Sequence, residues 1–204
     1  MDGIFELEIK VKSELRMGGN QTVSSQAILA EWDEIQAAQR EPALFRPLYD
    51  RYYDRIFRYI FKRTVDENLA ADLCSQVFLK AMQKLSGYKF KGVPFSAWLY
   101  RIAGNEVTQH FRNTGKQRVV SIQESDVKEM IDEVPEDDIT PSVNAMLSAL
   151  HELPEKDMNL IELRFFEHRP FKEIAQILNI TESNAKVKTY RILERMKKII
   201  LTKT

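Results

Sequence analysis

The stretch IAQILNITESNAKVKTYRILERM, residues 174–196, contains two amphipathic helical patterns separated by a break. Apolar and small residues recur at three- or four-residue steps within each pattern, at Ile174, Leu178, Ala185, Thr189, Ile192 and Met196. Such steps place them on one face of each helix. Between the patterns, Asn179 tolerates a left-handed backbone better than most non-glycine residues, and Thr181 is a suitable N-cap. The stretch predicts two short helices joined by a tight turn.

The second of these helices leaves polar side chains on its other faces. They are cations, an amide and an aromatic phenol: Asn184, Lys186, Lys188, Tyr190 and Arg191. Cations bind phosphates, whereas amide and hydroxyl groups can read base edges in the major groove. The pattern indicates a helix-turn-helix whose second helix enters that groove. An ordinary helical hairpin with a solvated basic face is the alternative.

A second candidate surface lies upstream, in FSAWLYRIAGNEVTQHFRN, residues 95–113. One row at three- and four-residue steps contains an aromatic, two amides and two arginines: Trp98, Arg101, Asn105, Gln109 and Arg112. Aromatics stack on bases at roughly 1–3 kcal/mol each, so this row suits single-stranded or melting DNA. The alternative for Trp98 is a place in the core. Gly104, inside the helix, predicts close approach by a neighbouring group.

Composition narrows the class of protein. The chain has 204 residues, of which 44% are hydrophobic and 29% are charged, as in an ordinary globular protein. One cysteine, Cys74, excludes a disulfide scaffold and a cysteine-built zinc site. No apolar run approaches the roughly 20 residues of a membrane helix, and no signal peptide opens the chain. We therefore expect a cytoplasmic protein without membrane insertion.

Catalytic motifs are lacking. The three histidines, His110, His151 and His168, are scattered, and none has metal-ligand spacing or a nucleophile beside it. We expect no metal, no cofactor, no small-molecule substrate and no enzymatic activity.

Charge divides the chain into blocks although the net charge is zero. Residues 42–120 hold 14 basic and 6 acidic residues, residues 121–141 hold 1 and 8, and residues 171–204 hold 8 and 3. Two basic blocks around an acidic stretch indicate two surfaces for a polyanion. The acidic stretch has Pro135 and Pro141 as breakers and few large apolar residues, which is typical of a linker.

These patterns predict an all-α fold: two small helical domains joined by an acidic flexible linker, with the helix-turn-helix in the C-terminal domain. The predicted boundaries are 1–41 for a partly flexible N-terminal extension, 42–118 for the first domain, 119–141 for the linker, and 142–204 for the second domain. In the first domain and the extension before it, helices are expected at 27–39, 43–63 and 95–113, and a further helix is expected to begin after an N-cap at Asp66. In the second domain, helices are expected at 143–151, 155–167, 171–178 and 182–200. The helix after Asp66 should bury Leu69, Leu73, Val77 and Met82. Residues 5–11 alternate like a strand, but Met17 is an alternative start, so residues 1–16 are not assured to be translated.

Four segments that follow one another along the chain carry a family resemblance. They are LYDRYYDRIFRYIFKR, DLCSQVFLKAMQKL, FSAWLYRIAGNEVTQHFR, and the run from LPEKDMNLIELRFF to ILERM. In this order they resemble an extracytoplasmic-function sigma factor of the sigma-70 family. The likeness covers residues 42–118 and 142–200. Asn179 stands where the family usually has glycine.

The resemblance implies a role for each domain. The first would be sigma domain 2, which binds the core polymerase and melts the minus-10 promoter element, with residues 88–95 as its specificity loop. Asn105 matches the position that holds a flipped base. The other implied minus-10 residues are Trp98, Arg101, Gln109, Arg112, Lys116 and Arg118. The residues implied in core-polymerase binding are Asp72, Gln76 and Phe78.

The second domain would be sigma domain 4, which reads the minus-35 element through Asn184, Lys186, Lys188, Tyr190 and Arg191. The expected partners are core RNA polymerase, promoter DNA and an anti-sigma factor of the kind that commonly inhibits family members. Two alternatives are a helix-turn-helix regulator that does not replace sigma, and a helical adaptor that binds an acidic protein.

Overall fold

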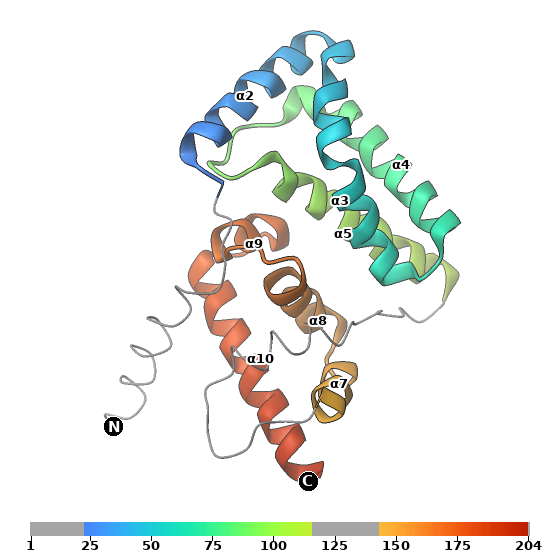
Figure 1. Ribbon diagram of the computed structural model, residues 1–204, viewed down its shortest axis with the longest axis vertical. Coiled ribbons are helices and arrows are strands. Elements are labelled where there is room, and N and C mark those ends of the chain that lie inside the picture. The colour runs from blue at the N-terminus through green and yellow to red at the C-terminus, as the bar shows by residue number, and fades with distance from the viewer. Residues whose placement is uncertain (1–22, 116–142, 204) are drawn as a thin grey trace. The chain divides into compact units, whose positions relative to one another are not determined.

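The computed structural model describes residues 23–115 and 143–203, and every regular element in these ranges is helical. The chain has two compact units, one described mainly by residues 23–115 and the other mainly by residues 143–203 (Figure 1). The predicted all-α fold is therefore confirmed for the described ranges. The predicted strand at 5–11 and linker at 119–141 lie outside them. No helix in the described ranges is both long enough and apolar enough to cross a membrane.

Between residues 23 and 115, which the structure describes, the first unit consists of four α-helices and two short 3₁₀ turns. The elements are α2 (Ser25–Arg40), η1 (Pro42–Phe45), α3 (Arg46–Thr64), α4 (Glu67–Lys84), η2 (Leu85–Gly87) and α5 (Phe95–Thr114). The α4 helix begins where predicted, because the Asp66 carboxylate accepts a hydrogen bond of 3.0 Å from the Leu69 amide.

The core of the first unit lies among α3, α4 and α5. Its fully buried large side chains are Phe45, Leu48, Ile56, Tyr59, Ile60, Phe95, Leu99 and Tyr100. A Cβ on Gly104 would lie 3.3 Å from the Tyr59 hydroxyl, so the predicted close approach at this glycine is confirmed. Glycine there lets α3 and α5 pack more closely than a side chain would allow.

The predicted buried face of α4 is wrong at Met82, and Leu69 is only half-buried. Leu73 and Val77 are buried, but Met82 is 45% exposed, and Ala81 takes the inward place. A helix turns by about 100° per residue, so a residue five positions after Val77 lies on a different side.

The α2 helix belongs to the first unit, which begins at Val23, before the predicted boundary at residue 42. Ser24 caps the helix by accepting a hydrogen bond from the Ala27 amide. Ile35 and Ala38 are buried against the unit. The helix expected at 27–39 is therefore present, and it packs on the core.

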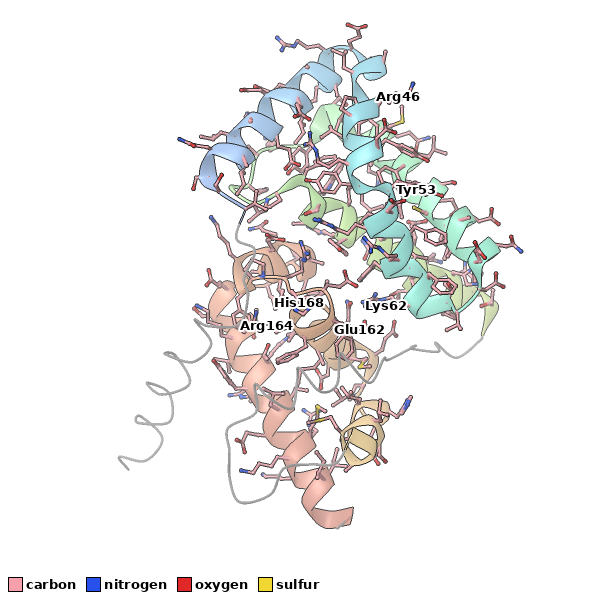
Figure 2. All side chains as sticks on the ribbon, viewed as in Figure 1. Arg46, Tyr53, Lys62, Glu162, Arg164 and His168 are labelled. Carbon is pink, nitrogen blue, oxygen red and sulfur yellow. The ribbon has the colours of Figure 1, made fainter. Side chains whose placement is uncertain are left out.

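The second unit contains α7 (Val143–His151), α8 (Glu155–Ile161) and α10 (Glu182–Lys203), and α9 (Phe171–Leu178) belongs to it up to Ile174. A single π-helical turn, η3 (Glu162–Phe166), follows α8. Glu162, Arg164 and His168 lie in the segment between α8 and α9 (Figure 2). The buried residues of α10 are the predicted ones, with Ala185, Thr189, Ile192 and Met196 each at most 2% exposed.

Candidate nucleic-acid interface

The polar row on α5 lies on the surface of the first unit. Four of its members are exposed: Arg101, Asn105, Gln109 and Arg112. The opposite face buries Leu99, Ala103 and Val107, so the helix presents this row outward by its own amphipathicity. The structure thus keeps these four members of the predicted row together. Lys116 and Arg118, which the resemblance implies in the same minus-10 site, lie outside the described residues.

The members of the row differ in what they bind. Arg112 donates to the Gln109 side-chain oxygen, and Gln109 donates to the Asn113 side-chain oxygen at 2.6 Å. Within the described part of the chain, Asn105 and Arg101 have no side-chain hydrogen bond or ion pair. Their donors and acceptors are therefore available to a ligand without breaking a bond in the protein.

Trp98 lies between the row and the core. Its ring is half-buried, with its centroid 4.8 Å from that of Tyr88 and 5.3 Å from that of Phe95. Burial, together with the nearby Glu31 carboxylate, raises the pKa of Tyr88 to about 12, so its phenol is neutral at ordinary pH. Trp98 therefore ends the row as part of an aromatic cluster rather than as a free surface ring.

The helix-turn-helix has the local geometry that the sequence predicted. Asn179 has a φ of 55°, which is the left-handed region. The Thr181 hydroxyl accepts a hydrogen bond of 3.2 Å from the Asn184 amide, as an N-cap does. Both predictions, the turn at Asn179 and the cap at Thr181, are confirmed.

The five predicted residues of α10 are spread around the exposed side of the helix. Asn184 and Lys188 lie one turn apart along one edge, whereas Lys186 and Tyr190 lie along the other edge. Lys186 pairs with Glu182 at 2.8 Å, but Lys188 and Arg191 make no ion pair within the described residues. The two edges therefore differ in which cations are available to a phosphate.

The middle of that outward side holds Ser183 and Val187, which are not among the five predicted site residues. Ser183, Val187 and Arg191 recur at four-residue steps, and Val187 is 46% exposed. The helical period alone could have identified Ser183 and Val187, because they lie on the side of α10 opposite the buried positions Ala185 and Thr189. Val187 offers a methyl contact of the kind that suits thymine.

Of the three residues implied in core-polymerase binding, only two are on the surface. Asp72 and Gln76 are exposed on α4, whereas Phe78 is 2% exposed. The Phe78 ring packs with its centroid 4.8 Å from Tyr49 and 6.1 Å from Tyr53, which lies on α3 (Figure 2). Phe78 can affect a partner only by holding α4 against α3.

The described residues contain no group of three or more His, Cys, Asp or Glu placed to hold a metal ion. Cys74 is fully buried, and that burial raises the pKa of its thiol to about 12. Thiolates are the reactive form, so Cys74 is poorly suited to nucleophilic chemistry.

Comparison with known proteins matches both units. The family model described as Sigma-70 region 2 matches residues 48–117, and Sigma-70, region 4 matches residues 144–196. The ECF RNA polymerase sigma factor BldN of Streptomyces coelicolor is 30% identical over 169 residues, which cover 81% of this chain and 64% of BldN. The ECF RNA polymerase sigma factor SigM of Bacillus subtilis is 26% identical over 165 residues, which cover 74% of this chain and 91% of SigM. The chain belongs to the extracytoplasmic-function sigma factors of the sigma-70 family.

Two solved structures share the fold of this sigma factor. CnrH in complex with the cytosolic domain of CnrY has a TM-score of 0.56 and 17% identity, over 86% of this chain and 99% of CnrH. The sigma factor RpoE in complex with the anti-sigma factor NepR from Bartonella quintana has a TM-score of 0.50 and 19% identity, over 76% of this chain and 96% of RpoE.

The matched regions coincide with the two candidate surfaces of the sigma factor. The region 2 match spans α3, α4 and α5, and the region 4 match spans α7 to most of α10. The polar row on α5 is in the first, and the helix-turn-helix is in the second. The α2 helix lies before the region 2 match.

Proposed function

We propose that this sigma factor directs core RNA polymerase to promoters by binding two promoter elements with its two helical units. The observation that carries the proposal is the order of regions 2 and 4 along the chain, each with an exposed polar helix face. The chain spans 64% of BldN, so its partners and its division of labour are proposed here rather than transferred.

The first unit would open the minus-10 element. Asn105 would hold a flipped base, because its amide is exposed and makes no bond to the described residues. Flipping costs a few kcal/mol, which phosphate contacts must offset. Arg101 and Arg112 would supply them, together with Lys116 and Arg118, which lie outside the described residues. Trp98 and Gln109 complete the proposed site.

The second unit would read the minus-35 element as a duplex. Residues near the start of a recognition helix contact base edges, which assigns that role to Asn184 and Val187. Lys188 and Arg191 make no ion pair within the described residues, so they would bind phosphates without first breaking one. Lys186 would have to leave its ion pair with Glu182, and Tyr190 would contribute from the same edge.

Core polymerase would bind the exposed surface of α4 around Asp72 and Gln76, with Phe78 supporting the helix from inside. A protein with these partners would act in the cytoplasm, and it would leave RNA synthesis to the polymerase. An anti-sigma factor is a further proposed partner, of the kind named in the RpoE–NepR complex.

Run-off transcription tests the proposal. Core polymerase from the organism that encodes the chain is mixed with the purified protein and fragmented genomic DNA, and the 5′ ends of the transcripts are sequenced. We expect defined start sites that depend on added protein and share two upstream elements. If transcripts appear only when another sigma factor is present, the helix-turn-helix regulator is correct instead. If neither core polymerase nor DNA is bound, the adaptor alternative gains support.

A further inference from the structure

A buried carboxylate on α2 contacts three groups of the first unit. Glu31 is 6% exposed, and its Oε2 accepts a hydrogen bond of 2.7 Å from the Phe95 amide, the first residue of α5. Its other oxygen accepts from the Tyr52 hydroxyl and lies 3.5 Å from Arg51 Nη1. Because α5 has no capping side chain of its own at Pro94, Glu31 satisfies one of the amides at the start of that helix.

Gln39, at the other end of α2, binds the backbone just before and at the first residue of the 88–95 loop. Its side-chain nitrogen donates to the Leu85 carbonyl at 2.8 Å and to the Tyr88 carbonyl at 2.9 Å. Between these two residues of α2, the Trp32 ring lies 5.5 Å from Phe90 and 6.1 Å from Tyr88, measured between centroids. The α2 helix thus holds the 88–95 loop at its beginning, in its middle and at its end.

We propose that α2 is a positioning element for minus-10 recognition: through Glu31, Trp32 and Gln39 it holds the 88–95 loop and the first turn of α5 in the conformation that reads DNA. The proposal deepens the proposed function and rests on it. It adds to the promoter-selecting machinery a helix that precedes the region 2 match.

The composition of the loop explains why external anchors are needed. Residues 88–94 form no regular element, and Gly92 has a φ of 65°. Lys89, Phe90 and Lys91 are exposed, so the loop offers two cations and a ring to a polyanion. An unanchored loop would lose conformational entropy on binding, and anchoring it beforehand improves affinity for that reason.

The sharpest test is Gln39→Glu, which keeps the side-chain shape but places an acceptor against two carbonyl oxygens. Gln36→Glu is the matched control, because it makes the same change on the exposed side of the same helix. Trp32→Phe is a second variant, which keeps an aromatic ring and leaves Trp98 as the remaining tryptophan of the two in the chain.

Each full-length variant is assembled with core polymerase and tested against a single-stranded minus-10 oligonucleotide and against minus-35 duplex. We expect Gln39→Glu to weaken oligonucleotide binding about tenfold and to reduce discrimination against substituted minus-10 sequences. Trp32→Phe should weaken it less. Minus-35 and core-polymerase affinities should remain within about twofold of wild type, as should all values for Gln36→Glu. A variant that is merely less stable would lower all of these affinities together.

Hydrogen exchange separates this proposal from the proposed function. In Gln39→Glu, amides of residues 88–95 should exchange faster than in Gln36→Glu, whether or not the protein supports transcription. Equal exchange in the two variants, or equal losses at minus-10 and minus-35, would overturn the role of α2. Wild-type protein that supports no initiation would instead contradict the proposed function, and the exchange result would still decide how the loop is held.

Discussion

The Tyr59 hydroxyl on α3 lies 3.3 Å from the position that a Cβ on Gly104 of α5 would occupy. Tyr59 has little room to move, because it is fully buried. Arg63 lies over its ring at 3.4 Å, and Tyr100 packs edge-on at 4.9 Å between centroids. This contact sets how closely α5 packs on the core.

Gly104→Ala should destabilise the protein in spite of the better helix propensity of alanine. The propensity gain is about 1 kcal/mol, whereas overpacking a rigid site costs about 1–3 kcal/mol. We expect a net loss of about 1 kcal/mol by urea denaturation of the first unit. In a Tyr59→Phe background, which removes the close oxygen, the same change should be neutral or stabilising. Equal effects in both backgrounds would mean that the contact is not the cause.

Asn105→Ala should impair promoter opening more than promoter binding. Removing the amide withdraws the group proposed to hold the flipped base, so we expect open complexes, detected by permanganate reactivity, to fall about tenfold. Closed-complex affinity at low temperature should be unchanged. Gln36→Ala, which removes an exposed amide on α2, is the control. Parallel losses in opening and closed binding would contradict the flipped-base role.

Lys188→Ala should change the salt dependence of minus-35 binding. Each lost phosphate contact makes the slope of log affinity against log salt shallower by about one ion. Titrations of labelled duplex by the holoenzyme at several salt concentrations measure this slope. Lys198→Ala, farther along α10, should leave it unchanged. If Lys188→Ala has the wild-type slope, Lys188 does not contact phosphate.

Cys74 should resist modification while the protein is folded. Burial first, and the charge of Asp54 second, raise the pKa of its thiol from 9.0 to about 12. Its thiolate fraction at pH 8 is therefore about a thousandfold lower than in the unfolded chain. A disulfide reagent should label native protein slowly and urea-unfolded protein fast. Rapid labelling of native protein would contradict this burial.

The same shift in the Cys74 pKa has a consequence for stability. Since the folded pKa is above the unfolded one, the protonated thiol contributes stability that is fully present below pH 9. That stability should be lost as the pH rises toward 12. The denaturation midpoints of wild type and Cys74→Ala, measured between pH 8 and 10.5, should therefore come closer together as the pH rises, because only the wild type loses this contribution.

Much of the architecture could be predicted because its signals are local. The cap at Asp66, the cap at Thr181 and the left-handed turn at Asn179 each depend on a few neighbouring residues. The buried stripe of α10 follows from helical period alone. The polar row on α5 is exposed for the same reason, since its spacing places it opposite the apolar stripe.

Other features could not be predicted because they depend on contacts between distant parts of the chain. The resemblance places Phe78 in the segment that binds core polymerase, but its ring is enclosed by aromatic side chains of α3 and η1. Met82 is a different case, because the helical period alone places it away from Val77 and could have excluded it from the core.

By itself, the sequence determined the helices, their caps and the faces they expose, because hydrophobic period and capping act within one or two turns. Only the tertiary structure decided that α2 belongs to the first unit and anchors the loop before α5. Glu31 and Phe95 are 64 positions apart, and Gln39 and Tyr88 are 49 apart. No periodic pattern links such residues, since a buried carboxylate finds its donors only after the helices have packed.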